Sequence, residues 1–288
     1  MPKIDERKRI NITNIGIDPV DVWEAASRVA TIVRARLDMP GSSPVARGDI
    51  DGSGATANSS GNLFDGESAY AAAYVCTPNA EHMMDAQKDA LFMRILNDAA
   101  IVVPDGAGVV LAARLLGYGR ISRAPGFDLA KKLVTNPTEY PFSFYFLGGK
   151  PGIAEKAAAN ITNENPNTRI AGYCDGFFTE ADEPDIIEAI NNSKADILYV
   201  ALGAPKAEKW IYKNRFKLQV SVCIGVGGTL DTFAGETRLA PSFFRAHGLE
   251  WLYRLAREPW RAKRMLKLPR YVIYTIWWRL TGRPGISQ

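Results

Sequence analysis

The sequence predicts an α/β fold, with a Rossmann-like, mostly parallel sheet that carries helices on both faces and is followed by a basic helical appendage. Continuous apolar runs alternate with segments of helical periodicity, a pattern typical of strands that are buried on both sides. Glycine, aspartate, asparagine and threonine cluster where these apolar runs end. The 288 residues, of which 47% are hydrophobic, are enough to form one large core.

The elements follow in order along a predicted domain of residues 1–245. Residues 10–37 predict a short strand, a turn at Asp18-Pro19 and an amphipathic helix. Residues 39–68 are rich in glycine, serine, aspartate and asparagine, and they predict a mobile insertion. Strands and helices then alternate. The predicted strands cover residues 73–77, 100–104, 142–148, 169–174, 195–203 and 220–228, and the predicted helices cover 80–97, 106–117, 126–134, 152–164, 183–193 and 205–214.

Positive charge is concentrated at the C-terminal end of the chain. The formal net charge is +4, but residues 238–288 hold eleven Lys/Arg and two acids, so this segment carries +9 and the rest carries −5. Such a tail predicts an anionic partner of its own. Trp and Tyr side chains interleave with the basic ones, which favours an anionic membrane surface over nucleic acid.

We therefore expect residues 246–288 to form a basic amphipathic appendage that associates with a membrane. Pro259 and Pro269 are expected to break it into short helices. The alternative is a helical hairpin packed on the body of the protein or on another subunit, since amphipathic helices usually bury one face. The basic residues expected at the membrane are Arg254, Arg257, Arg261, Lys263, Arg264, Lys267 and Arg270.

Glycine-bearing turns follow three of the predicted strands. Glycine lets the backbone approach a ligand closely, and the N–H groups at the start of the next helix suit a phosphate. No single turn matches a P-loop or a GxGxxG sequence, so each alone is equally well a plain turn. Together they favour a nucleotide or sugar-nucleotide cleft. The predicted substrate-binding residues are Gly106, Gly148, Gly149, Gly203, Pro205, Lys206, Glu208, Gly225, Gly227, Gly228 and Asp231.

Four residues are candidates for the chemistry itself. Asp105 directly follows an apolar strand, where its carboxylate could act as a general base or simply cap the next helix. Thr77 and Asn79 flank Pro78 at the end of another strand, where they could cap a helix or meet a ligand. Arg123 lies in a polar loop, where it could offset charge on a leaving group.

Several functional classes are disfavoured. The three cysteines lie in or beside apolar runs, and there are only two histidines, so neither a disulfide framework nor a zinc site is indicated. The Asp49-Ile50-Asp51 triplet matches a metal-binding pattern, but it lies in the polar insertion and is best explained by chance. We expect no metal and no cofactor. An NAD-dependent oxidoreductase would need a GxGxxG fingerprint that the chain lacks.

The N-terminal residues are charged rather than apolar, and no apolar run approaches the roughly 20 residues that cross a bilayer. We expect a cytoplasmic protein bound peripherally to the inner face of the cell membrane.

Six short motifs occur in the order found in one family. They are TPNAE (77–81), PDGAGVV (104–110), RAPGFDL (123–129), FLGGKPG (146–152), LGAPKAEKW (202–210) and GVGGTLDTFAGE (225–236). From about residue 10 to 282, apart from the insertion, the chain resembles the WecG/TagA/CpsF glycosyltransferases. The resemblance implies inverting, metal-independent transfer of a sugar from a UDP-sugar to a polyprenyl-diphosphate-linked saccharide, as in cell-surface polysaccharide or teichoic acid-like synthesis.

The resemblance also implies residue roles. Asp105 matches the proposed catalytic base, Thr77 and Asn79 match an active-site polar pair, and Arg123 matches a residue acting on the diphosphate. The basic appendage matches a membrane-targeting segment that also closes over the active site. Ala207 departs from the family, which usually has Gln there, so the sugar could be N-acetylmannosamine, its uronic acid or glucose. A non-catalytic nucleotide-sugar or lipid-binding module is the alternative, and a homo-oligomer is possible.

Overall fold

The computed structural model describes residues 9–38, 71–246, 248–257 and 267–281. Its centre is a six-stranded sheet in the order β4-β3-β8-β7-β5-β6, and every neighbouring pair of strands in it is parallel. The prediction of a mostly parallel sheet is confirmed. The strands are β3 (Ala73–Cys76), β4 (Ile101–Val102), β5 (Ser143–Gly148), β6 (Arg169–Cys174), β7 (Ile197–Ala201) and β8 (Val222–Gly225).

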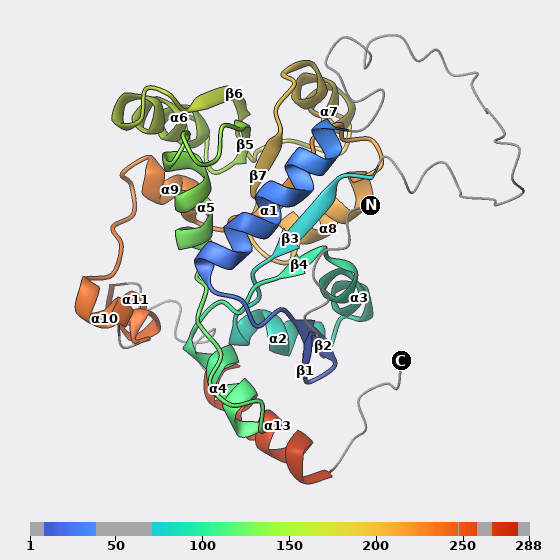
Figure 1. Ribbon diagram of the computed structural model, residues 1–288, viewed down its shortest axis with the longest axis vertical. Coiled ribbons are helices and arrows are strands. Elements are labelled where there is room, and N and C mark those ends of the chain that lie inside the picture. The colour runs from blue at the N-terminus through green and yellow to red at the C-terminus, as the bar shows by residue number, and fades with distance from the viewer. Residues whose placement is uncertain (1–8, 39–70, 247, 258–266, 282–288) are drawn as a thin grey trace, which may run out of the picture.

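Helices cover both faces of this sheet (Figure 1). Each face has its own apolar core, because the central strands are buried on both sides. One core is covered by α1 (Val22–Leu37), α5 (Gly126–Thr135), α6 (Ile153–Glu164) and α9 (Thr229–Phe233). The other is covered by α2 (Ala80–Ala86), α3 (Ala90–Asp98), α4 (Ala107–Leu115), α7 (Glu183–Asn192) and α8 (Lys206–Asn214).

The N-terminal segment differs from the prediction of a single strand. It forms an antiparallel hairpin of β1 (Ile10–Ile12) and β2 (Ile15–Ile17), a sheet separate from the main one. Thr13 and Asn14 make the two-residue turn with φ of 51° and 68°. Positive φ at both turn residues matches the right-handed twist of a tight hairpin, and Asn tolerates that conformation better than most residues.

The single helix predicted over residues 80–97 is also wrong. The structure has two helices there, α2 and α3, with a break at residues 87–89. The Asp89 side chain accepts a hydrogen bond from the Phe92 N–H at 3.0 Å and so caps the start of α3. An aspartate cap favours a new helix start over continuation of the first.

The C-terminal part contains α10 (Ser242–Ala246), α11 (Glu250–Arg257) and α13 (Lys267–Thr281). The prediction that Pro269 breaks a helix is wrong. Pro269 lies in the first turn of α13, where a residue needs no N–H group for an intrahelical hydrogen bond. Pro259, Arg261, Lys263, Arg264 and the insertion at 39–68 lie outside the described residues.

Helix α13 packs against α2 and α4, beside which it lies in Figure 1. Tyr271, Thr275 and Trp278 form its buried face. The inner face of α13 is therefore part of the same apolar core as α2 and α4. That residues 246–288 form a separate domain stays a prediction. Among the described residues, no helix is both long and apolar enough to cross a membrane.

Candidate active site

A cleft of about 1220 Å³ opens where the parallel strands end. Residues that follow each of the six strands line it, as expected for a ligand site in an open α/β sheet. Thirteen of the predicted catalytic and substrate-binding residues lie along this cleft: Thr77, Asn79, Asp105, Gly106, Arg123, Gly149, Gly203, Lys206, Glu208, Gly225, Gly227, Gly228 and Asp231.

The remaining two predicted residues, Gly148 and Pro205, are not part of the lining. Gly148 has φ 124°, and a Cβ atom on it would lie 2.5 Å from the carbonyl of Ala201. Its missing side chain thus allows β5 and β7 to approach closely. Pro205 is the residue that precedes the first turn of α8.

Asn79 is both a helix cap and part of the cleft wall. Its Oδ1 accepts hydrogen bonds from the N–H groups of Glu81 at 2.9 Å and His82 at 3.1 Å, and His82 Nδ1 accepts one from the Asn79 N–H at 3.4 Å. This capping box fixes the side chain at the start of α2. The same arrangement leaves the Asn79 amide nitrogen without a donated hydrogen bond to any described residue.

Thr77 packs directly against Gly126, the first residue of α5. A Cβ atom on Gly126 would be 2.7 Å from Thr77 Oγ1. Glycine at this position therefore allows the hydroxyl-bearing end of β3 and the start of α5 to meet. Thr77 is held by packing, and α5 is aimed at the cleft by the same contact.

Asp105 does not cap a helix. The residue preceding α4 is Gly106, with φ 85°, and none of the described side chains makes a cap hydrogen bond there. The helix-cap interpretation of Asp105 is therefore wrong. The carboxylate is half-buried in the cleft wall, three residues beyond the end of β4.

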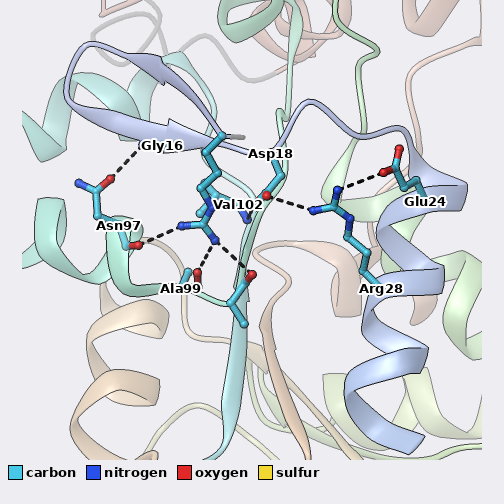
Figure 2. A network of polar contacts seen from close by, with 9 residues as sticks. Gly16, Asp18, Glu24, Arg28, Asn97, Ala99 and Val102 are labelled. Atoms are coloured by element: carbon cyan, nitrogen blue, oxygen red, sulfur yellow. Dashed lines mark hydrogen bonds and ion pairs between the residues drawn. The ribbon is translucent and has the colours of Figure 1, made fainter. Parts of the chain in front are cut away.

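A buried carboxylate on the far side of β4 fixes that short strand (Figure 2). Asp18 accepts a hydrogen bond from the Val102 N–H at 2.7 Å and pairs with Arg9 and Arg28, each at 3.1 Å. Its own N–H donates to the Val102 carbonyl at 2.9 Å. Arg9 further donates to backbone carbonyls at the end of α3, including that of Ala99. The network anchors a strand of only two residues, and with it the segment that carries Asp105.

Arg123 is engaged by the C-terminal part of the chain. Its Nη2 donates to Glu250 Oε1 at 3.2 Å and to the backbone carbonyl of Arg245 at 3.1 Å. Arg245 in turn pairs with Asp128 at 2.6 Å, in the first turn of α5. The start of α11 is thereby tied to the cleft rim, and four of its residues join the lining: Glu250, Trp251, Tyr253 and Arg257.

Glu208 lies at the floor of the cleft. It is only 7% exposed, and its Oε2 is buried without a hydrogen-bond partner among the described residues. Desolvation by burial raises the pKa of this carboxyl group. Among the described residues, no cluster of His, Cys, Asp and Glu has the form of a metal site.

Sequence reasoning missed several parts of the lining. One is the segment Gly176–Thr179, which follows β6 and brings Phe177 and Phe178 to the cleft. Its position after a predicted strand was the signal that could have identified it. Another is Glu250, at the start of α11. The resemblance implied that residues 246–288 close over the active site, but it did not single out Glu250, whose contact with Arg123 depends on tertiary packing.

The chain matches the model of the family described as "Glycosyl transferase WecG/TagA/CpsF family" over residues 56–285. This chain belongs to the WecG/TagA/CpsF glycosyltransferase family. The matched region includes the whole six-stranded sheet, the cleft, and helices α11 and α13. The resemblance seen in the six motifs is thus confirmed.

Two curated relatives of this WecG/TagA/CpsF chain carry the same name, N-acetylglucosaminyldiphosphoundecaprenol N-acetyl-beta-D-mannosaminyltransferase. The protein of Bacillus subtilis (strain 168) is 36% identical over 201 residues, which are 70% of this chain and 78% of the relative. That of Bacillus spizizenii (strain ATCC 23059 / NRRL B-14472 / W23) is 34% identical over 200 residues, which are 69% of this chain and 77% of the relative.

Proposed function

We propose that this chain is an inverting glycosyltransferase that moves a sugar from a UDP-sugar to a polyprenyl-diphosphate-linked saccharide. The observation that carries the proposal is the meeting of Asp105, Arg123 and the glycine turns in one cleft, in a chain of a glycosyltransferase family. The two relatives are named for transfer of N-acetylmannosamine to a diphosphoundecaprenol-linked N-acetylglucosamine. Of the three sugars that the sequence allows (N-acetylmannosamine, its uronic acid and glucose), the names of the relatives favour N-acetylmannosamine.

The mechanism assigns Asp105 as the general base. Its carboxylate takes the proton of the acceptor hydroxyl as the oxygen attacks the anomeric carbon of the donor from the face opposite UDP. The bond between that carbon and the diphosphate oxygen breaks, and UDP leaves with the electron pair. A single displacement of this kind inverts the anomeric configuration.

The departing diphosphate needs positive charge and hydrogen-bond donors. Gly203 and Gly227 lie at turns with positive φ, just before the helices α8 and α9. Backbone N–H groups at such helix starts stabilise phosphate oxygens. Arg123 supplies a full charge for the same purpose, once its ion pair with Glu250 opens.

The assignment is tested by UDP release from purified protein. The donors are UDP-N-acetylmannosamine, its uronic acid and UDP-glucose, and the acceptors are a short-chain prenyl-diphosphate-N-acetylglucosamine and a prenyl-diphosphate disaccharide. We expect UDP-N-acetylmannosamine to give UDP release, and we expect this release to require an acceptor. Absence of UDP release from every pair would contradict the proposal.

We further propose that the outer face of α13 rests on the inner surface of the cell membrane. Apolar side chains are exposed there: Ile273 (67%), Ile276 (42%), Trp277 (42%) and Leu280 (80%). Arg270 is also exposed, and each basic residue near an anionic surface adds about 1 kcal/mol of attraction. Lys267, by contrast, points to α2 and pairs with Glu81 and Asp85.

Substitution of exposed residues tests this better than deletion of residues 246–288. Deletion would uncover the part of the core that Tyr271, 0% exposed, fills. Ile273→Ser combined with Leu280→Ser should reduce cosedimentation with vesicles of phosphatidylglycerol and phosphatidylethanolamine. Leu91→Ser, at an exposed leucine on α3, is the control. Equal cosedimentation of all three proteins would contradict the membrane contact.

A further inference from the structure

Glu208 lines the cleft near the ends of two neighbouring strands, β3 and β8. It is the third residue of α8, and its Oε1 would lie 3.1 Å from a Cβ atom on Gly225, at the end of β8. Burial, and after it the neighbouring Glu208 carboxyl group, raises the pKa of the Cys76 thiol at the end of β3. Since β3 and β8 are neighbouring strands, Glu208 lies where the ends of these two strands meet, inside the strand order β4-β3-β8-β7-β5-β6.

The location of Glu208 indicates which part of a substrate it would meet. The glycine turns after β5, β7 and β8 lie on one side and suit the diphosphate. Asp105 and Thr77, which follow β4 and β3, lie on the other side. The group that must sit between a departing diphosphate and the general base is the sugar being transferred.

The chemical state of Glu208 follows from its surroundings. Its Oε2 is buried and has no hydrogen-bond partner among the described residues. An ionised carboxylate in such a place loses its hydration without compensation, so the neutral acid is favoured. The neutral form carries an O–H group, which can donate a hydrogen bond that a carboxylate cannot.

We propose that Glu208 is a specificity-determining residue that, as a neutral acid, donates a hydrogen bond to an uncharged oxygen of the transferred sugar, a hydroxyl or an acetamido carbonyl. This inference rests on the proposed function. A purely structural role does not account for the unpartnered oxygen, because an apolar side chain of similar size would fill the same space without burying a polar group.

Two substitutions separate the hydrogen bond from the shape and the charge. Glu208→Met keeps an unbranched chain of similar length but cannot donate, and Glu208→Gln restores a donor without an ionisable group. Binding of UDP and of UDP-N-acetylmannosamine is measured by calorimetry, kcat and KM by UDP release, and folding by thermal unfolding. Glu208→Leu is a second apolar variant in case Glu208→Met does not fold.

We expect Glu208→Met to weaken binding of the UDP-sugar about 10- to 100-fold and to raise KM to a similar extent. Binding of UDP alone, which lacks the transferred sugar, should change less than about 2-fold by the same reasoning. Glu208→Gln should recover most of the lost affinity. The Met variant should also unfold at a higher temperature than wild type, because it no longer buries an unpartnered oxygen.

Three results would overturn the inference: equal weakening of UDP and UDP-sugar binding, unchanged UDP-sugar binding in Glu208→Met, or no recovery in Glu208→Gln. Failure of the proposed function is distinguishable from these, because wild-type protein would then release no UDP from any donor and acceptor pair. In that case the inference falls with the proposed function before any variant is compared.

Discussion

Arg123 and Glu250, which are 127 residues apart in the chain, form an ion pair of 3.2 Å at the rim of the cleft. Arg123 follows the segment that carries Asp105, and Glu250 is the first residue of α11. A carboxylate therefore holds the guanidinium that we assign to the diphosphate. The contact links the C-terminal part of the chain to the chemistry, and it must open before Arg123 can serve a departing UDP.

Glu250→Gln should increase the affinity for UDP. Both partners of the ion pair are partly exposed, at 21% and 27%, so the pair is worth up to about 1 kcal/mol, which corresponds to about a 5-fold lower Kd for UDP. Calorimetry measures this directly. Asp98→Asn, which breaks the exposed Arg94–Asp98 pair on α3, is the control for the same change in net charge. Unchanged or weaker UDP binding in Glu250→Gln would contradict the idea that Glu250 and the diphosphate of UDP compete for Arg123.

Asp18→Ala should destabilise the protein far more than a neighbouring aspartate substitution. Asp18 is 4% exposed and bonds to two arginines and to the Val102 N–H, so its loss leaves buried charge without a partner and costs about 3 kcal/mol. Asp21→Ala removes only an exposed cap on α1, which costs about 1 kcal/mol. Urea unfolding compares the two variants, and equal losses would show that the network does not anchor β4.

The stability conferred by Glu208 should depend on pH. Its pKa is raised above the ordinary value of 4.5 in the folded state, so the folded protein holds this proton more tightly than the unfolded chain. The contribution is fully present below about pH 4.5 and is lost as the pH rises through the raised pKa. Glu208→Gln removes this dependence. The free energy of unfolding of Glu208→Gln, relative to that of wild type, should therefore rise from pH 4.5 toward neutrality. The rise is at most about 1.4 kcal/mol per pH unit.

Urea unfolding of wild type and Glu208→Gln at several pH values tests this. The Cys76 thiol, at the end of β3, interacts with Glu208. Burial and then Glu208 raise the pKa of this thiol, so it stays neutral over this range. On α8 itself, Lys209 is paired with Asp89. A difference between the two proteins that stays constant with pH would contradict the neutral state of Glu208.

The parallel sheet and the position of the cleft could be predicted from the sequence, because both depend on local features. Buried parallel strands must be apolar along their whole length, and the residues directly after them must gather at one edge. The break between α2 and α3 also had a local signal, since Asp89 precedes an apolar helical run, but the continuous periodicity concealed it.

Other features depend on packing between distant segments and could not be predicted in this way. The composition of the tail shows that it is basic and aromatic, but not that Tyr271 enters the core while Ile273 stays exposed. In the sequence, Glu208 resembles an ordinary acidic residue in the first turn of a helix, a position that favours acids. Only the fold reveals that β3 and β8 bury it and leave one of its oxygens without a partner among the described residues.

Asp105→Asn tests the role of Asp105 as the general base most directly. UDP release with donor and acceptor, and UDP binding, are measured for this variant. Asn has the same shape but cannot take the acceptor proton. We expect kcat to fall about 10²- to 10⁴-fold, while the Kd for UDP stays within about 2-fold of wild type. Asp98→Asn, outside the cleft, should turn over like wild type. Turnover by Asp105→Asn within about 3-fold of wild type would contradict the assignment of Asp105 as the general base.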